Sequence, residues 1–460
     1  MSNVQRHDHK KMSVVMLWVI LFMFVQLSNE SIIQLLAPVM VEYYGVTMVK
    51  ISIIVTIGGI VFGVGGTIYS VLTEVLSMRQ LFLFGIITFC IGSLIGFIVH
   101  PWFALFAVAR FIQCMGAVCA TGCYIVLVSR YLPEKVQSTY LAVSTALFLL
   151  GAGLGVLAGS FITNYLSWEF ALLLPFVTAL AIPVIYKHMP NDRPGKGKLD
   201  IPGAVIVSIG VIFSILAISL QNYYCLFGAI LFLAGYVMYA RRRQNPFLEL
   251  KLLSIKGLKL TYVTTFLLFG VQYCVLFLLP FIVREMYGLT LLQTGWLFLA
   301  ANSPALATAM ITGKVVSKIG RNRTFYLGWS LFFTSLVLFT ICMGAPLYFI
   351  WLAMFLFAIS NPFLYTGIVT AASGLLPDAK LGSGMGIFLL MMGWGNSVVV
   401  SVMGLLLTNR LIDFRIFPYI SNGADASSYS NAYLILAIIF FIVFLLYRYV
   451  HGNKVYKHEQ

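Results

Sequence analysis

The sequence contains few charged residues, and this scarcity excludes a soluble globular protein. Only 9% of the 460 residues are Asp, Glu, Lys or Arg, whereas 61% are hydrophobic. Soluble domains have roughly 25% charged and 45–50% apolar residues. Acidic residues are especially few, with 14 against 29 Lys and Arg, which gives a net charge of +15. Such an excess is typical of proteins that bind nucleic acid or an anionic surface, so its distribution along the chain matters.

The sequence also lacks features of ATP-driven pumps and metal-dependent enzymes. It has no Gly-x-x-x-x-Gly-Lys-Ser/Thr segment, which argues against an ATP-driven pump. The six histidines lie at the chain ends or at the edges of apolar segments, without metal-ligand spacing. The seven cysteines all fall within apolar segments, so they cannot form an extracellular disulfide framework. We therefore expect no enzyme, no metal site and no cofactor.

Long apolar segments dominate what is present. A membrane-spanning helix needs about 20 mostly apolar residues, so we predict an all-α polytopic membrane protein with 14 transmembrane helices. The basic N-terminal residues lead into an apolar stretch too long for a cleavable signal peptide, which indicates a first spanning helix. The predicted spans are residues 13–38, 49–72, 80–99, 102–128, 138–163, 168–186, 201–220, 223–240, 259–283, 291–315, 324–343, 347–372, 383–408 and 430–449.

The basic residues support this arrangement, because Lys and Arg gather in cytoplasmic loops. An even number of spans with a cytoplasmic N-terminus places both termini in the cytoplasm and 24 of the 29 basic residues on that side. The outer loops hold only Lys50, Arg284, Arg410 and Arg415, and Arg110 alone lies deep inside a span. The net charge therefore indicates membrane topology and contact with the lipid bilayer rather than nucleic-acid binding.

Two polar cytoplasmic stretches, at residues 187–200 and 241–259, divide the chain. We expect an N-terminal six-helix bundle in residues 1–187 and a linker with two additional transmembrane helices in residues 188–255. A C-terminal six-helix bundle with a cytoplasmic tail would occupy residues 256–460. The short loops leave no room for a signalling or ligand-binding domain, which argues against a receptor or scaffold.

Four segments resemble motifs of a known family. Residues 70–80 (SVLTEVLSMRQ) and 313–323 (GKVVSKIGRNR) resemble weakened copies of the Gly-x-Leu-x-Asp-x-x-Gly-Arg-Lys loop of the major facilitator superfamily. Residues 109–117 (ARFIQCMGA) resemble its fourth-helix motif, and residues 149–161 (LLGAGLGVLAGSF) resemble its fifth-helix antiporter motif. With 14 spans, the chain is most similar to the 14-helix drug:proton antiporters, which include the Gram-positive tetracycline and multidrug efflux proteins.

The resemblance implies roles for two groups of residues. Three small residues at four-residue spacing, Gly151, Gly155 and Gly159, would let another helix approach and help to seal the membrane against leak. Val156 replaces the proline of this motif, so the expected kink is missing. The two loop motifs would form a cytoplasmic latch between the bundles, made by Glu74, Arg79, Gly313, Gly320 and Arg321. A solvated loop carboxylate is the alternative for the acid of the first motif.

One acidic residue lies inside a predicted span. Glu30 has Gln26 and Gln34 four residues to either side, so the three form a polar stripe on an apolar helix. A charge near the membrane centre is energetically costly and normally faces a cavity or a partner. Burial favours a protonated carboxyl group, whereas a nearby cation favours the carboxylate. We therefore predict that Glu30 exchanges protons, and a purely structural ion pair is the alternative.

Arg110 is the predicted counter-charge of Glu30. At a rise of about 1.5 Å per residue, each of the two residues lies about 12 Å from the outer end of its helix. Gln113 lies three residues further along the same face as Arg110 and joins the predicted network. The resemblance implies that the fourth-helix arginine takes part in proton coupling. A structural arginine bonded to helix carbonyls is the alternative.

The spans of the second bundle contain no acidic residue. They offer amide, aromatic and thioether side chains instead, which suit bulky, partly apolar molecules. A proline inside a span, as at Pro362, frees carbonyl groups that can face a cavity. With Gln26 and Gln34, the predicted substrate-binding residues are Gln272, Tyr273, Trp296, Asn302, Asn361, Tyr365, Met391, Trp394 and Asn396.

These observations predict a proton-coupled antiporter that exports amphipathic or lipophilic drugs by alternating access. Tetracycline is a second candidate substrate, although residues 151–155 and 393–397 lack the additional acids of the tetracycline exporters that the chain resembles. A facilitator for an endogenous metabolite or lipid is the alternative. We expect a monomer in a bacterial plasma membrane. Its partners would be a small-molecule drug, protons or another monovalent cation, and the lipid bilayer, without nucleic acid.

Overall fold

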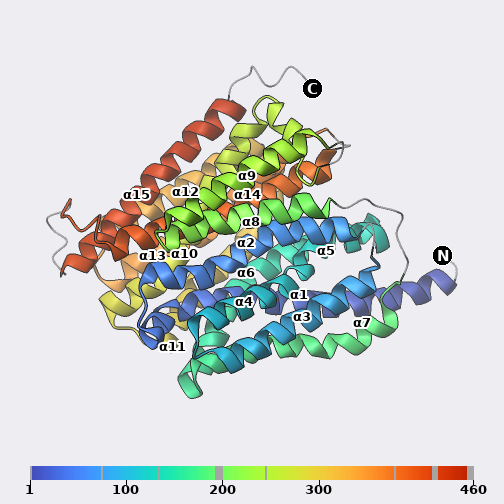
Figure 1. The fold of residues 1–460 in the computed structure, drawn as a ribbon, viewed down its shortest axis with the longest axis horizontal. Helices are drawn as coiled ribbons and strands as arrows, with labels where there is room; N and C mark the ends of the chain where they lie inside the picture. The colour runs from blue at the N-terminus through green and yellow to red at the C-terminus, as the bar shows by residue number, and fades with distance from the viewer. Residues whose placement is uncertain are drawn as a thin grey trace.

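The computed structural model of the chain describes residues 3–73, 76–132, 134–191, 200–243, 246–377, 380–416 and 423–452. Within these ranges every regular element is a helix (Figure 1). The elements are α1 (Asn3–Tyr44), α2 (Met48–Leu72), α3 (Met78–Val99), α4 (Phe103–Ala117), α5 (Cys119–Tyr131), α6 (Glu134–Tyr165), η1 (Trp168–Ala181), α7 (Ile182–His188), α8 (Ile201–Ser219), α9 (Tyr223–Arg241), η2 (Leu250–Ser254), α10 (Leu258–Tyr287), α11 (Leu291–Ile319), α12 (Arg321–Ile341), α13 (Leu347–Ser373), α14 (Leu381–Thr408), α15 (Gly423–Tyr447) and η4 (Arg448–Gly452).

Twelve helices of the described chain are long and apolar enough to cross a membrane. They coincide with twelve of the predicted spans, so the prediction of an all-helical polytopic membrane protein is confirmed at that level. The remaining predicted spans, at 138–163 and 291–315, correspond to α6 and α11, which have 32 and 29 residues. These two helices pack against each other.

Local sequence explains where several helices begin and end. Ser77 and Thr290 each cap a helix N-terminus in a capping box with a glutamine three residues later, Gln80 and Gln293. Gly288, at a φ of +62°, ends α10 in the left-handed conformation. These caps satisfy backbone groups at the points where the helices begin or end.

The N-terminal helices α1–α7 and the C-terminal helices α10–α15 meet mainly along three helix pairs: α2 with α14, α6 with α11, and α1 with α10. Glu42 of α1 forms an ion pair with Arg284 of α10. The amide of Val49 donates to the Thr408 hydroxyl at 3.3 Å. In Figure 1 the two sets of helices lie close together at the left and spread apart toward the side that carries both termini.

Glycines allow the closest of these contacts. Gly59 and Gly63 on α2 lie against Gly393 on α14, and a Cβ atom added to Gly393 would overlap the Gly59 carbonyl oxygen. Small residues at such crossings let helix backbones approach and gain van der Waals contact, which drives helix association inside a membrane. A close backbone contact between the two halves therefore lies along α2 and α14.

The hairpin of α8 and α9 lies outside the two sets. α8 packs on both α2 and α14, and so covers the seam between the halves. Two hydrogen bonds attach it to α14: Trp394 Nε1 donates to Ser214 Oγ at 3.0 Å, and the hydroxyls of Ser219 and Ser401 lie 3.2 Å apart. α9 packs on α8 and has only 17% of its spanning window buried. The hairpin thus presents most of α9 to the surroundings.

Candidate functional site

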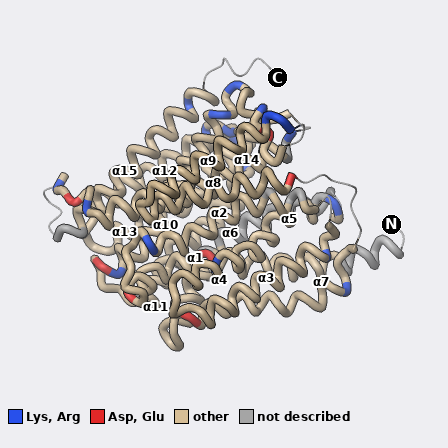
Figure 2. The backbone as a smooth tube through the Cα atoms, in the orientation of Figure 1, with Lys and Arg blue, Asp and Glu red and all other residues tan. Residues whose placement is uncertain are grey.

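Charged residues lie mostly at the helix ends, but a red and a blue segment adjoin between the labels α1 and α4 in Figure 2. Glu30 on α1 and Arg110 on α4 form an ion pair, with 2.7 Å between Oε1 and Nη2. The Arg110 side chain is 0% exposed, whereas that of Glu30 is 21% exposed. The arginine is therefore fixed inside the protein, while its partner carboxylate stays accessible.

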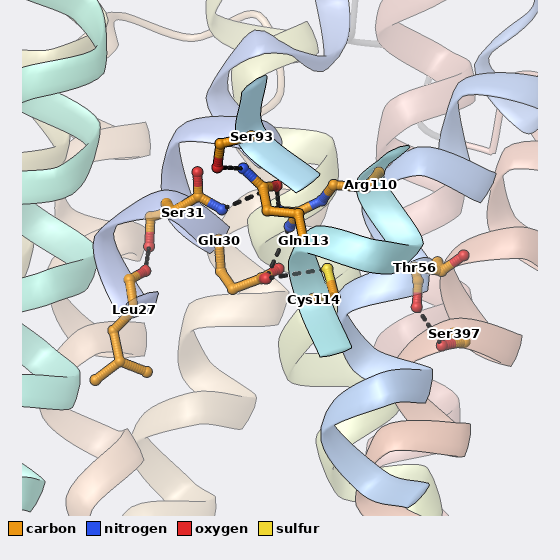
Figure 3. Close-up of polar contacts among 10 residues, drawn as sticks. Leu27, Glu30, Ser31, Thr56, Ser93, Arg110, Gln113, Cys114 and Ser397 are labelled. Carbon is orange, nitrogen blue, oxygen red and sulfur yellow. Dashed lines mark hydrogen bonds and ion pairs between the residues drawn. The ribbon is translucent and has the colours of Figure 1, made fainter. Parts of the chain in front are cut away.

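Gln113 connects this ion pair to α1 and α3 (Figure 3). Its Oε1 accepts a hydrogen bond from Arg110 Nη1 and another, at 3.4 Å, from Asn29 Nδ2. Its Nε2 donates to Ser93 Oγ at 2.8 Å. Such a chain of hydrogen bonds in a low-dielectric interior holds its members in one arrangement. Gln113 thus positions the guanidinium that faces Glu30.

Further residues of α4, α10 and α2 lie beside the Glu30 carboxylate. The Cys114 thiol of α4 donates to Oε1 at 3.7 Å. Tyr273 of α10 has electrostatic contacts with Glu30 and Arg110. Gly58 of α2 lies so close that an added Cβ would overlap the carboxylate. Since α10 belongs to the C-terminal helices, residues of both halves lie near this carboxylate.

Two predicted substrate-binding residues join this site and a third lies near it on α1. The side chains of Gln34 and Tyr273 lie close to each other beside the ion pair. Gln26 is buried, and its Oε1 has no hydrogen-bond partner within the described residues. A buried polar atom without a partner costs about 1–3 kcal/mol.

The amide residues of α11, α13 and α14 bond mostly to helix carbonyls. Asn302 and Asn361 donate to the carbonyls of Phe298 and Phe357, four residues earlier. The Asn396 amide lies 2.9 Å from the Phe269 carbonyl oxygen. Helix α13 continues from Leu347 to Ser373 through its proline. Pro362 offers no amide to the carbonyl of Ala358, four residues before it, whereas Asn361 binds the Phe357 carbonyl, and the helix continues without a break.

The other predicted substrate-binding residues lie on several different helices. Trp296 is exposed and meets Phe161 of α6 edge to face. Tyr365 is also exposed, with its ring 6.1 Å from that of Phe269. Gln272 is buried, Met391 is half-buried, and Trp394 donates to α8 as described above. The predicted set is therefore spread over the α6–α11 pair, α10, α13 and α14, and only part of it contacts Glu30.

The glycine stripe of α6 lies against α1. Gly151 faces Leu27, Gly155 faces Ser28, and the third glycine faces Ile32. The sequence predicts no kink in this segment, and α6 runs unbroken from Glu134 to Tyr165. Because Gly155 packs against Ser28, two residues before Glu30 on α1, the stripe sets the position of the helix that carries the carboxylate. Gly159 completes this contact.

The residues of the predicted cytoplasmic latch bond within their own halves. Arg79 donates to the Met189 carbonyl at 2.9 Å, and Arg321 donates to the Thr370 carbonyl at 3.4 Å. Gly320, at a φ of +85°, joins α11 to α12 in a conformation that favours glycine. Glu74 lies outside the described residues, and an added Cβ on Gly313 would meet no atom within 4 Å.

Four residues of the site were not predicted as site residues. Asn29, Cys114 and Gly58 contact the Glu30–Arg110–Gln113 group, and Ser93 lies at its far end. Cys114 and Asn29 adjoin predicted site residues in the sequence, which is a usable signal. Ser93 and Gly58 come from other helices, and their roles depend on tertiary packing that no local pattern reveals.

Comparison with known proteins finds related membrane transporters. A sequence profile of the Major Facilitator Superfamily matches residues 19–399 and, in a second match, 261–459. The chain is 24% identical over 326 residues to the uncharacterized MFS-type transporter YwoD of Bacillus subtilis (strain 168), covering 68% of this chain and 72% of that protein.

Two relatives carry names that describe export or resistance. The cephamycin export protein CmcT of Amycolatopsis lactamdurans is 28% identical over 241 residues, 49% of each chain. The multidrug resistance protein Stp of Mycobacterium tuberculosis (strain CDC 1551 / Oshkosh) is 23% identical over 72% of this chain and 64% of its own length. A POT family transporter solved with 5-aminolevulinic acid shares the fold, with a TM-score of 0.68 over 94% of this chain and 96% of its own at 14% identity.

Proposed function

Because the chain belongs to the Major Facilitator Superfamily, we propose that it is a proton-coupled antiporter that exports amphipathic or lipophilic drugs. Family membership indicates a transporter rather than an enzyme. The relatives named for cephamycin export and multidrug resistance support drugs as substrates. The observation that carries the coupling proposal is the Glu30–Arg110 ion pair, a partly exposed carboxylate held beside a fully buried guanidinium.

The ion pair can exchange a proton for a substrate. When Glu30 gains a proton, its attraction to Arg110 falls and the carboxyl group no longer needs its charged partner. When a cationic or polar drug enters, it competes with the proton for the same carboxylate. Tyr273 of α10 lies near this site, beside Gln34 of α1. A change of charge at Glu30 would therefore alter a contact between the two halves, which is what coupling to a conformational change requires.

Alternating access would use the contacts between the two sets of helices. The Glu42–Arg284 pair and the Val49–Thr408 hydrogen bond join them at the helix ends remote from the chain termini. We propose that these contacts break when the transporter opens to the other side, and that the loop motifs at Glu74 and Arg321 latch the opposite ends in that state.

The proposal includes a specific topology. Fourteen spans, formed by the twelve helices described above together with α6 and α11, would divide into residues 1–187, 188–255 and 256–460. Both termini would lie in the cytoplasm of a bacterial cell, with a monomer in the plasma membrane. The excess of basic residues in the loops on the side of the termini supports this orientation.

The experiment measures drug movement driven by a pH gradient. The purified protein is reconstituted in liposomes, and uptake of ethidium, a fluorescent lipophilic cation, and of tetracycline is followed with and without an imposed gradient. We expect gradient-driven transport by the wild type and none by Glu30→Gln, because the amide cannot release a proton. Glu169→Gln, which removes a carboxylate at the start of η1 that accepts a hydrogen bond from the nearby Ser167 hydroxyl, is the matched control and should retain driven transport.

The outcomes separate the proposal from its alternative. Normal gradient-driven transport by Glu30→Gln in correctly inserted protein contradicts the coupling role of this residue. Downhill transport by the wild type that ignores the gradient favours a facilitator of a metabolite or lipid. Extending the assay to sodium gradients distinguishes protons from another monovalent cation.

A further inference from the structure

The C-terminal end of α9, which we propose to lie on the cytoplasmic side, carries a hollow lined by both apolar and cationic side chains. Its volume is about 350 Å³, and its lining residues are Met238, Tyr239, Arg242 and Arg243. The spanning segment of α9 ends at Arg241, so the hollow lies at the level where an apolar helix leaves the membrane. Met238 and both lining arginines are exposed. The hollow is therefore accessible from the membrane surface.

Hydrogen bonds fix the aromatic wall of this hollow. The Tyr239 hydroxyl donates to Asp200 Oδ1 at 2.6 Å, and the Arg243 guanidinium lies 5.3 Å from the centre of the Tyr239 ring. Asp200 also accepts hydrogen bonds from the backbone amides of Gly203 and Phe247. These bonds tie the start of α8, the end of α9 and the following segment together, so the hollow has a built frame.

The cations of the hollow are available to an external anion. The one carboxylate bonded to its wall, Asp200, is occupied by one hydroxyl and two amide donors. Within the described residues, neither Arg242 nor Arg243 takes part in an ion pair. Guanidinium groups bind phosphate oxygens through paired, charge-assisted hydrogen bonds. Two of them at the edge of an apolar hollow form a site for a phosphate that carries an apolar chain.

We propose that this hollow binds an anionic glycerophospholipid. The head-group phosphate would lie between Arg242 and Arg243, and an acyl chain would follow Met238 along the exposed apolar side of α9, where Phe227 and Leu231 are also exposed. Basic residues at the end of a spanning helix attract anionic lipids. A free phosphate would bind the arginines but would leave the apolar side chains uncovered. A lipid would contact both kinds of lining residue.

The hollow is connected through α8 to the seam between the two halves. α9 packs on α8, and α8 packs on both α2 and α14 at the seam between the halves. A lipid bound at the end of α9 would therefore contact the hairpin that covers this seam. The binding proposal itself is independent of which substrate is transported and of whether protons drive transport.

The test measures lipid binding to the full-length protein. The purified protein in detergent is titrated with phosphatidylglycerol or phosphatidylcholine, and bound lipid is counted by native mass spectrometry. We expect a preference for phosphatidylglycerol that falls about fivefold for each arginine removed, and about 30-fold in Arg242→Gln/Arg243→Gln. Arg241→Gln removes a neighbouring charge that does not line the hollow, and should leave binding nearly unchanged.

Three results would overturn the proposal. Equal binding of the two lipids by the wild type would show no anion preference. An equal loss in Arg241→Gln would indicate diffuse attraction by the basic run instead of a site. Displacement of the lipid by millimolar inorganic phosphate would indicate a small-anion site. The variant Arg242→Lys/Arg243→Lys keeps the charge but not the paired hydrogen bonds and should bind with intermediate affinity, while melting temperatures confirm that each variant is folded.

Discussion

The two halves of the molecule differ in the chemistry of their interiors. The N-terminal helices enclose an ion pair, Glu30 with Arg110, and a chain of amide and hydroxyl groups that supports it. Across the described residues of α10–α15, buried polar groups away from the helix ends are neutral, as at Gln272 and Asn396. One half therefore carries an ionisable centre, and the other offers a neutral, adaptable surface. Tyr273 of α10 lies near the ionisable centre from the neutral half.

The two halves should also differ in how much stability they lose when a buried polar contact is removed. Removing one member of a buried ion pair typically costs about 3–5 kcal/mol, because the remaining charge is left uncompensated. Losing a neutral hydrogen bond typically costs about 0.5–1.5 kcal/mol. If the ionisable centre lies only in the N-terminal half, substitutions there should dominate both stability and pH dependence. The predictions below test this asymmetry.

The largest effect is expected for Arg110→Gln. The substitution leaves the Glu30 carboxylate without its cation, and we expect a loss of stability of up to about 3–5 kcal/mol, lessened by the solvent access of that carboxylate. The pH-gradient-driven transport should also be lost. Thermal unfolding in detergent and the liposome assay measure the two effects. Arg130→Gln, which removes a hydrogen bond to the Thr73 carbonyl at a helix end, is the control and should change both much less.

The double variant Glu30→Gln/Arg110→Gln separates structure from coupling. Two neutral amides leave no unpaired charge, so we expect its melting temperature to recover relative to Arg110→Gln alone. Driven transport should stay lost, since no group is left to exchange a proton. Recovery of driven transport in the double variant would show that the pair has only a structural role.

Much of this asymmetry could be predicted from the sequence. The spans follow from apolar length, and the similar depth of Glu30 and Arg110 follows from the fixed rise of a helix. Gln113 follows from helical periodicity. These inferences depend on local geometry only, and the structure places all three residues in one connected group.

Contacts between different helices were predicted less completely from the sequence. The sequence gives no indication that Gly58 borders the carboxylate or that Trp394 donates to α8. A proline in α13 suggested a break in the helix, yet α13 continues from Leu347 to Ser373 through Pro362. Periodicity identifies the polar residues of a helix but does not say which neighbouring helix faces them.

A smaller effect is expected for Gly58→Ala, which tests the packing around the ionisable centre. The new methyl group would overlap the Glu30 carboxylate, and we expect a cost of about 1–3 kcal/mol with a displaced ion pair. Gly235→Ala on α9, where an added Cβ meets no atom within 4 Å, is the matched control. Because alanine favours a helix over glycine by up to about 1 kcal/mol, the control should be neutral or slightly stabilising.

The readout for this comparison combines melting temperature with the pH profile of transport. A shifted ion pair should change the pH at which driven transport is half-maximal, which a general loss of packing would not do. If Gly58→Ala matches Gly235→Ala in both measurements, the carboxylate has room to move, and the close contact between Gly58 and Glu30 does not constrain the ion pair.

The smallest effect is expected in the neutral half, for the hydrogen bond between Trp394 and Ser214. Trp394→Phe and Ser214→Ala each remove one partner, and in a double-mutant cycle we expect an interaction of about 0.5–1.5 kcal/mol. The Ser214 hydroxyl also donates to the Val211 carbonyl, so the cycle isolates the contact between α14 and α8 from local helix bonding. Neither variant should change the pH dependence of transport. A pH shift as large as that of the Glu30 site would mean that the C-terminal half also carries part of the proton response, and the division between a charged and a neutral half would fail.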